Sequence, residues 1–181
     1  MENLLKIIRK AIYIYQKLRR GTAKGRGSAV NYLVHSHCGG ISVFPKSLSE
    51  EIQDAIKGID IFLKNGVATN IRDEFLTKLR IAGWSGELVL SPESNITITS
   101  SKNGVGLCCQ TGNMARMYAD LLKLQALYLN GVISCGAYIL PSSPVAAKLG
   151  SNIANATRLE RELDIFKKVY NLPTLVFSLE E

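Results

Sequence analysis

Three short apolar runs, separated by two helical patterns, constrain the fold of this chain more than any other feature. The runs cover residues 104–109, 132–140 and 174–179, and each predicts a strand. A helix is expected from 113 to 130, and another from 153 to 168. Parallel strands need crossover connections of this kind, so this part of the chain predicts a βαβαβ unit with a parallel core.

The preceding segment predicts further helices and strands. Residues 47–64 and 70–83 show the helical spacing of apolar side chains, and the first helix is expected to begin with a capping box formed by Ser47 and Glu50. Two short strands with a proline-containing turn between them are expected over residues 86–101. We therefore predict an α/β fold, a mixed β-sheet flanked by helices, in a single domain that spans the whole chain.

The first 28 residues carry all of the chain's excess positive charge. They hold eight basic side chains and one acidic side chain, the rest holds fourteen of each, and the net charge is +7. Residues 3–20 predict a basic amphipathic helix, and the glycine-rich stretch 19–28 predicts a flexible basic loop. Such an arm is typical of a protein that binds a polyanion, either nucleic acid or an acidic membrane surface. The candidate DNA-binding residues of the arm are Lys17, Arg19, Arg20, Lys24 and Arg26.

Composition bounds the class of protein. With 46% hydrophobic and 20% charged residues, the chain is typical of a soluble globular protein. No apolar run approaches the roughly 20 residues that a membrane-spanning helix needs. Charges interrupt every apolar stretch near the N-terminus, so no signal peptide is indicated. We expect a cytoplasmic protein without a transmembrane segment, whose four cysteines are reduced and mostly buried.

The strand, turn and helix of "NGVGLCCQTGNMARMYADLLKLQ" form the strongest candidate for a functional site. Side chains two positions apart on a strand share a face, so Cys108 and Gln110 are expected on one face and Cys109 on the other. In a large class of nucleases such a strand carries a carboxylate and, two positions later, a second functional residue. Both side chains can then reach one metal ion and one scissile phosphate.

The segment "HSHCGGISVFP" brings both histidines, His35 and His37, close to Cys38. A metal site is conceivable, but no fourth ligand with zinc-finger spacing follows, and ordinary histidines in a loop or at a strand end are expected. A cysteine-based activity, in which Cys108 or Cys109 would pair with a histidine, stays open as an alternative.

Residues from about 70 to 179 resemble the BglII/BstYI-type restriction endonucleases of the PD-(D/E)XK nuclease superfamily. The resemblance is carried by "GVGLCCQTGNMARMYADLLKLQALYLNGVISCGAYILP", by the helix and strand after it, and by the upstream helix "IRDEFLTKLRIAGW". In that family the core strand reads Glu-x-Gln, and an aspartate precedes it on the neighbouring hairpin. The resemblance implies a restriction-endonuclease-like fold, Mg²⁺ as cofactor, double-stranded DNA as partner, and a homodimer.

Carried over to this chain, the family's glutamine falls on Gln110, its glutamate on Cys108 and its aspartate on about Thr99. Both metal-binding carboxylates are therefore substituted. A thiolate is a soft ligand that suits Mg²⁺ poorly, and the hydroxyl of threonine is neutral. We expect a degenerate catalytic site on a fold that still binds DNA.

Two other interpretations stay open. An active nuclease could use carboxylates at other positions, because only their place in space matters. The candidate acids are Glu87, Glu93 and Asp120, with Asp73 and Glu74 on the preceding helix as further candidates. Alternatively, the chain is a non-enzymatic module whose basic helix binds a protein partner or an acidic membrane surface. Of the three interpretations, we favour DNA binding without strong metal-dependent cleavage.

The helix after the turn supplies two more candidate DNA contacts, Arg116 and Lys123. Its pattern predicts Asp120 on the solvent side with these two cations, where both can pair with it along the helix. Phosphate contacts and solvated helix pairs are both consistent with this placement. The core face is expected to consist of Met114, Tyr118, Leu121, Leu122, Gln125, Tyr128 and Leu129.

Overall fold

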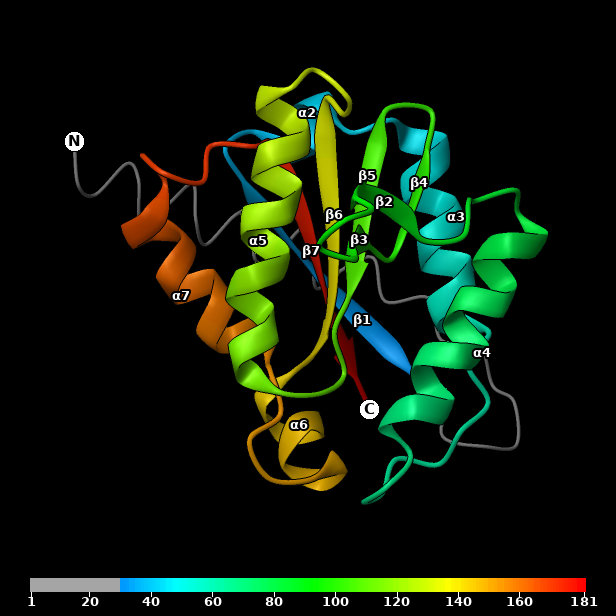
Figure 1. Cartoon of the computed structure of the whole chain (residues 1–181). Coiled ribbons are helices and arrows are strands. Elements are labelled where there is room, and N and C mark those ends of the chain that lie inside the picture. The colour runs from blue at the N-terminus through cyan, green and yellow to red at the C-terminus, as the bar shows by residue number, and fades with distance from the viewer. Residues whose placement is uncertain (1–29) are drawn as a thin grey trace.

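The fold is built on a five-stranded mixed β-sheet with helices on both faces (Figure 1). The computed structural model describes residues 30–181, so the basic helix and loop expected for residues 1–28 lie outside the described residues. The elements, in chain order, are β1 (Asn31–His37), α2 (Gly40–Val43), α3 (Lys46–Lys57), α4 (Ala68–Ile81), β2 (Leu88–Ser91), β3 (Ile96–Ile98), β4 (Ser100–Lys102), β5 (Val105–Cys109), α5 (Met114–Leu129), β6 (Cys135–Pro141), α6 (Ser143–Leu149), α7 (Ala156–Phe166) and β7 (Thr174–Glu180).

The strand order of the main sheet is β1-β7-β6-β5-β4. Strands β5, β6 and β7 run parallel, with Cys108 opposite Tyr138 and Tyr138 opposite Val176. Strand β1 runs antiparallel to β7, and β4 runs antiparallel to β5. Helix α5 connects β5 to β6, while α6 and α7 connect β6 to β7. The predicted βαβαβ unit and the mixed sheet are therefore confirmed.

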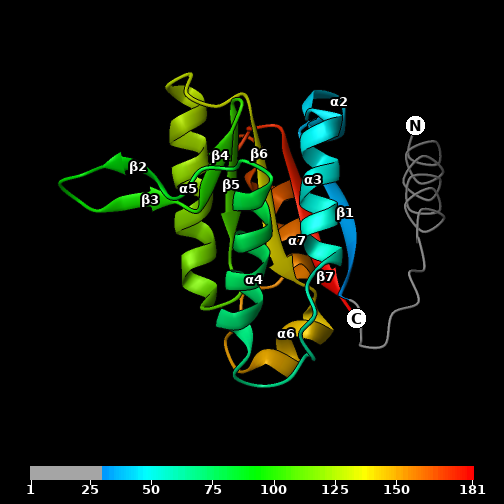
Figure 2. The same ribbon diagram turned by 90° about the vertical axis from the view of Figure 1, so that its right-hand side faces the viewer.

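The sheet separates two hydrophobic cores. Helices α3 and α4 cover one face, called here the α3/α4 face, and α5 and α7 cover the other, the α5/α7 face (Figure 2). Every residue of β6 is buried, because both faces of this strand are covered. Its continuous apolar run is the pattern expected for such a strand. None of the helices in residues 30–181 is long and apolar enough to span a bilayer.

Three elements are not predicted from the sequence: the one-turn helix α2, strand β1 and helix α6. Strand β1, "NYLVHSH", lies at the edge of the sheet, and most of its residues are only half buried. An edge strand of mixed polarity gives a weak periodic signal. Helix α6 is short, and it begins after Ser142, whose hydroxyl accepts a hydrogen bond from the backbone N–H of Val145.

Helix α3 begins and ends earlier than predicted. Its first residue is Lys46, and Pro45 occupies the N-cap position without a side-chain cap. The expected capping box of Ser47 and Glu50 is therefore wrong, because Ser47 already lies inside the helix. Proline suits a helix start, since its ring sets a φ angle compatible with the first turn. The helix ends at Lys57 rather than at residue 64, with a glycine at its C-cap.

Helix α5 buries only part of the face predicted for it, including Leu121 and Gln125, and it also buries residues beside that face. Met117, Asp120 and Leu124 are buried, whereas Leu122 and Leu129 are 65% and 71% exposed. Large apolar residues occur on both sides of this helix, so their spacing alone did not select the buried side. The consequence is that Asp120 points into the α5/α7 core rather than to solvent.

The run "NITITSS" forms two strands in two different sheets. Strand β3 pairs with β2 in a separate two-stranded sheet, and β4 pairs with β5 in the main sheet. Figure 2 shows the β2–β3 ribbon extending away from the main sheet. Thr99 lies at the junction of the two strands, and this break places it beside the end of β5.

Candidate functional site

The two cysteines at the end of β5 lie on opposite faces of the sheet, as predicted. Cys108 is fully buried in the core of the α5/α7 face, and Cys109 is 4% exposed in the core of the α3/α4 face. The alternation of side chains along a strand requires this arrangement. The position that the resemblance assigns to the family's glutamate is therefore closed to solvent.

Burial keeps both thiols protonated. Desolvation, and then the negative charge of Asp120, raise the pKa of Cys108 well above its usual value, and the positive charge of Lys123 opposes this only in part. Burial raises the pKa of Cys109 to about 12, although the positive charge of Arg72 opposes the shift. Neither thiol forms a thiolate near neutral pH, so neither is an effective nucleophile or metal ligand.

Thr99, to which the resemblance assigns approximately the family's aspartate, is hydrogen bonded to the backbone of β5. Its hydroxyl oxygen accepts a hydrogen bond of 3.1 Å from the backbone N–H of Cys109. The side chain is neutral and its oxygen already has a donor. Thr99 thus joins the β3–β4 junction to the end of β5.

Gln110 occupies the strand end that the resemblance assigns to the family's glutamine. Its side-chain oxygen Oε1 accepts a 2.9 Å hydrogen bond from the backbone N–H of Gly112. A side-chain carbon added at Gly112 would lie 3.1 Å from that oxygen, so the amide of Gln110 would have to shift slightly to make room for it. The amide Nε2 lies 3.5 Å from Oδ2 of Asp120, which is the long limit of a hydrogen bond. Gln110 therefore links the turn to helix α5.

Asp120 is the carboxylate that the fold brings to this strand end. It is 8% exposed. Its Oδ1 accepts a 2.9 Å hydrogen bond from the ammonium of Lys123, and its Oδ2 accepts one of 3.3 Å from the hydroxyl of Tyr138. The Tyr138 hydroxyl also lies 3.2 Å from the carbonyl oxygen of Met117. We call Cys108, Gln110, Asp120, Lys123 and Tyr138 the β5–α5 cluster.

Sequence reasoning did not single out Tyr138 and placed Asp120 on the wrong side of its helix. A signal was present for both residues. A tyrosine inside the otherwise apolar run "GAYILP" needs a polar partner for its hydroxyl when buried. Asp120 lies between Met117 and Leu124 at the three- and four-residue spacing of a buried helix face. Together these features predict a tyrosine–carboxylate contact between α5 and β6.

The other candidate acids do not join this cluster. Glu87 lies 4.0 Å from a guanidinium nitrogen of Arg72 and accepts a 3.3 Å hydrogen bond from the Thr97 hydroxyl. Glu93 is exposed in the turn between β2 and β3. Of the three principal candidates, Asp120 alone contacts Gln110.

The two further acids lie on α4, which covers the other face of the sheet. Glu74 lies 3.5 Å from Lys78 and accepts a hydrogen bond from the backbone N–H of Asp60. Asp73 lies 4.0 Å from its neighbour Arg72. Their contacts are therefore with the α3/α4 side of the molecule.

The residues at the strand end do not fit a Mg²⁺ ion. Among residues 30–181, no three His, Cys, Asp or Glu side chains are grouped so that they could hold a metal ion. The two positions that the resemblance assigns to the family's carboxylates carry a buried protonated thiol and a neutral hydroxyl, and the nearby carboxylate of Asp120 is already paired with Lys123. Mg²⁺ requires oxygen ligands that are free to coordinate it, and anionic ones in particular.

The histidines lie far from both thiols of β5. They belong to β1, and the sheet order places β7 and β6 between β1 and β5. Three spacings of about 4.8 Å put these strands roughly 14 Å apart. His37 instead contacts the backbone oxygen of Tyr170 at 2.8 Å and the thiol of Cys38 at 3.2 Å. The alternative of a Cys–His catalytic pair at β5 is therefore wrong.

The candidate DNA contacts divide into two groups. Arg116 is exposed on α5 and forms no ion pair with any of residues 30–181, so the expected Arg116–Asp120 pair is absent there. Lys123 is half buried and pairs with Asp120. The five basic residues of the N-terminal arm, Lys17, Arg19, Arg20, Lys24 and Arg26, lie outside the described residues.

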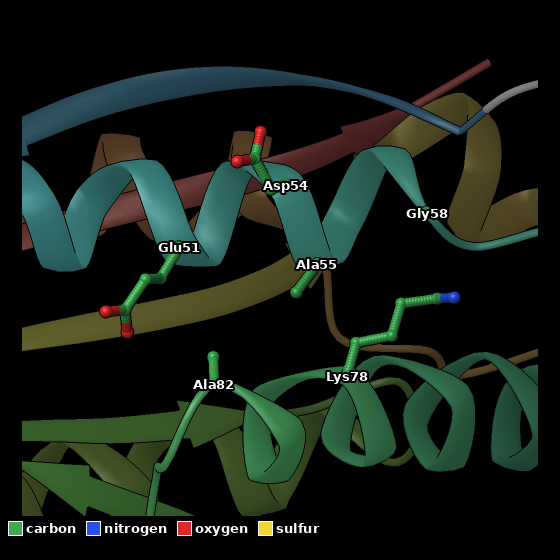
Figure 3. A pocket seen from close by; sticks show the side chains of 6 residues that line it. All are labelled: Glu51, Asp54, Ala55, Gly58, Lys78 and Ala82. Atoms are coloured by element: carbon green, nitrogen blue, oxygen red, sulfur yellow. The ribbon is translucent and has the colours of Figure 1, made fainter.

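A pocket lies between α3 and α4, away from the β5–α5 cluster (Figure 3). Its volume is ≈ 340 Å³, and its charged lining residues already have partners. Glu51 binds Lys102, while Asp54 and Lys78 pair with neighbours on their own helices. No unpaired charge in this pocket points to a ligand.

Comparisons with known proteins agree with this architecture. Residues 32–179 match the family model described as "Restriction endonuclease BglII/BglIII". The fold is similar to that of the restriction endonuclease BglII in complex with a DNA 16-mer, with a TM-score of 0.74, 10% identity, and 83% of this chain and 78% of that chain covered. It is also similar to free BglII, with a TM-score of 0.65, 11% identity, and 83% and 80% covered.

The family match extends further than the resemblance found in the sequence. That resemblance begins at about residue 70, whereas the family match begins at residue 32, close to the start of β1. No curated protein matches the chain in a sequence search. The family match covers most of the 181 residues, and the chain therefore belongs to the BglII/BglIII restriction endonuclease family.

Proposed function

We propose that this protein binds double-stranded DNA through a restriction-endonuclease fold without strong metal-dependent cleavage. The observation that carries the proposal is the replacement of both family carboxylates by side chains that are neutral and already packed or hydrogen bonded, Cys108 and Thr99. DNA binding itself is supported by the family, by the DNA complex of its structural neighbour, and by the basic N-terminal arm. Phosphate contacts by lysine and arginine supply affinity without any metal.

Binding is tested with a fluorescently labelled duplex in EDTA over a series of salt concentrations. We expect affinity to fall steeply with salt, because each neutralised phosphate releases counterions. Neutralising Lys17, Arg19 and Arg20 together should lower the slope of log K against log salt by about three. A matched triple at Lys46, Lys57 and Lys64, on and after α3, should leave the slope unchanged. Wild-type affinity that does not respond to salt would contradict the proposal.

Cleavage is tested on supercoiled plasmid at high protein concentration with Mg²⁺ and, separately, with Mn²⁺. We expect no linear or nicked product above the level of a buffer control. Metal-dependent cleavage activity that co-purifies with the protein would overturn the proposed loss of cleavage.

A second candidate is an active nuclease with displaced acids, and one contact favours it. Asp120 lies 3.5 Å from the amide of Gln110, next to the position where the family carries its glutamate. This candidate predicts metal-dependent cleavage that disappears in Asp120→Asn and persists in Glu93→Gln, which alters an exposed turn. The pairing of Asp120 with Lys123 weighs against it.

A non-enzymatic interaction module is the outcome if neither activity is found. Binding to vesicles containing acidic lipid, with no binding to duplex DNA, would support that function instead. If DNA binding is found, a homodimer on a palindromic duplex is the assembly that we propose, because a two-fold symmetric protein matches a two-fold symmetric site. Sedimentation with and without duplex measures the oligomeric state.

A further inference from the structure

The ammonium of Lys123 is hydrogen bonded to one carboxylate and retains free donors. It donates a 2.9 Å hydrogen bond to Oδ1 of Asp120, which is its one acceptor among residues 30–181. An ammonium group has three donors, so two remain for another partner. The side chain of Lys123 is 28% exposed, whereas that of Asp120 is 12% exposed. A cation is thus anchored from the protein side and open toward solvent.

This cation acts on the position where the family places a metal ligand. The charge of Lys123 lowers the pKa of the Cys108 thiol against the larger effect of burial, so the ammonium lies within electrostatic reach of that residue. The same carboxylate that anchors Lys123 also contacts Gln110, at 3.5 Å. Through Asp120, Lys123 is therefore linked to the strand end that the resemblance assigns to the family's metal site.

The charges at this strand end balance without a metal. Two carboxylates with one divalent cation carry no net charge, and the pair of Asp120 with Lys123 carries none either. A phosphate that approaches the ion pair from the solvent side meets the ammonium first, because the carboxylate is the more buried partner. At short distance the nearer charge dominates, and the attraction is stronger where water is partly excluded.

We propose that the Lys123 ammonium, anchored by Asp120, replaces the charge of the family's metal ion and binds a phosphate of the DNA backbone. This inference rests on the proposed DNA-binding function and makes binding independent of divalent metal. Its ligand is a phosphodiester group, recognised by charge rather than by sequence.

A purely structural role for Lys123 makes a different prediction. Removing the ammonium alone leaves Asp120 as an unpaired, mostly buried carboxylate, and this charge would repel DNA whatever Lys123 contacts. The double variant Asp120→Asn/Lys123→Gln removes both charges and keeps the side-chain sizes. If Lys123 serves only to neutralise Asp120, the double variant should bind DNA as the wild type does.

The experiment measures duplex binding by fluorescence anisotropy in EDTA at several salt concentrations. We expect Lys123→Gln to weaken binding about tenfold or more, and the double variant to remain several-fold weaker than the wild type. In both variants the slope of log K against log salt should fall by about one, the value for one lost phosphate contact. Lys123→Arg keeps the charge and should retain most of the affinity.

The matched control is Lys57→Gln on α3. Lys57 pairs with Asp54 at the same three-residue helix spacing as Lys123 with Asp120, but on the opposite face of the sheet. We expect its affinity and salt slope to equal those of the wild type. Wild-type affinity and slope in the Asp120→Asn/Lys123→Gln variant would overturn the inference, and circular dichroism melting verifies that each variant is folded.

A metal titration supplies an independent test. At constant ionic strength, we expect the same wild-type affinity in EDTA and in Mg²⁺, whereas a tenfold gain with Mg²⁺ would overturn the inference. Different results would contradict the proposed DNA binding and the proposed phosphate contact of Lys123. Wild-type protein that does not bind duplex removes both, while wild-type binding that the Lys123 variants leave unchanged removes the inference alone.

Discussion

Two lysine–carboxylate pairs, Lys102–Glu51 and Lys123–Asp120, lie on opposite faces of the central sheet and differ in how completely they are satisfied. On the α3/α4 face, the Lys102 ammonium donates to both carboxylate oxygens of Glu51, at 2.9 and 2.8 Å, and to the backbone oxygen of Ala82 at 2.6 Å. Glu51 also accepts a 2.8 Å hydrogen bond from the indole N–H of Trp84. On the α5/α7 face, Lys123 has a single acceptor among residues 30–181.

This difference distinguishes the Lys102–Glu51 pair, which stabilises the fold, from the Lys123–Asp120 pair, which can bind a ligand. All three donors of Lys102 are used, and they join α3, α4 and β4 around the partly buried Glu51. Lys123 and Asp120 lie three residues apart on one helix, so their contact joins no distant segments of the chain. A satisfied, long-range pair contributes to stability, whereas a short-range pair with free donors can accept a ligand at little cost to the fold.

The largest expected effect comes from breaking the satisfied pair. Glu51→Ala removes the acceptor of both Lys102 and Trp84 and should lower the free energy of unfolding by about 2–3 kcal/mol, because partly buried donors lose their partners. DNA affinity should stay unchanged. Urea denaturation measures the loss. Glu50→Ala, an exposed neighbour 3.8 Å from Lys46, is the control, and an equal loss there would contradict the assignment.

The next effect concerns the metal. Restoring the family's carboxylates with Thr99→Asp/Cys108→Glu should allow some Mn²⁺ binding, and adding Lys123→Gln should tighten it about tenfold, or about 1.4 kcal/mol, because the competing cation is gone. Electron paramagnetic resonance of free Mn²⁺ measures this without relying on cleavage. Only variants with a native circular dichroism spectrum are compared. If the added Lys123→Gln change left Mn²⁺ affinity the same, Lys123 would not occupy the metal's position.

The coupling within each ion pair compares the two faces directly. A double-mutant cycle on Asp120 and Lys123 should give a coupling energy of about 0.5 kcal/mol, as for a partly exposed helix pair. The same cycle on Glu51 and Lys102 should give about 2 kcal/mol, because that pair is bidentate and more complete. Both values come from urea denaturation of the single and double variants. Equal coupling energies would remove the distinction between the two faces.

The two thiols of β5 should be equally unreactive, although they lie on opposite faces of the sheet. Cys108 and Cys109 are buried, and burial raises the pKa of each thiol, to about 12 for Cys109. Each therefore stays protonated near neutral pH, and a disulfide reagent should modify neither in the native protein. Cys38 is exposed and should react alone, although burial of its sulfur raises its pKa as well. Denaturant should expose all four thiols, and fast native modification of Cys108 would show that this strand end is open.

The sequence predicted the helices and strands that show a clear apolar pattern along the chain. The parallel order of β5, β6 and β7 follows from three apolar runs with helices between them, and the opposite faces of Cys108 and Cys109 follow from strand geometry. It did not predict β1, because an edge strand is half buried and its pattern is mixed. It also missed the break at Thr99, where two strands that read as one join different sheets.

The candidate site was also predicted from the sequence only in part. By itself, the sequence led only to an expected loss of carboxylates, because the resemblance assigns Cys108 and about Thr99 to the family's carboxylate positions and Gln110 to its glutamine. Only the tertiary structure decided which residues stand beside them. The side of α5 that faces the sheet depends on packing against β6, and that packing turned Asp120 inward to Tyr138 and left the ammonium of Lys123 with free donors. Spacing along one helix cannot choose between two apolar sides, whereas the partner strand can bury only one of them.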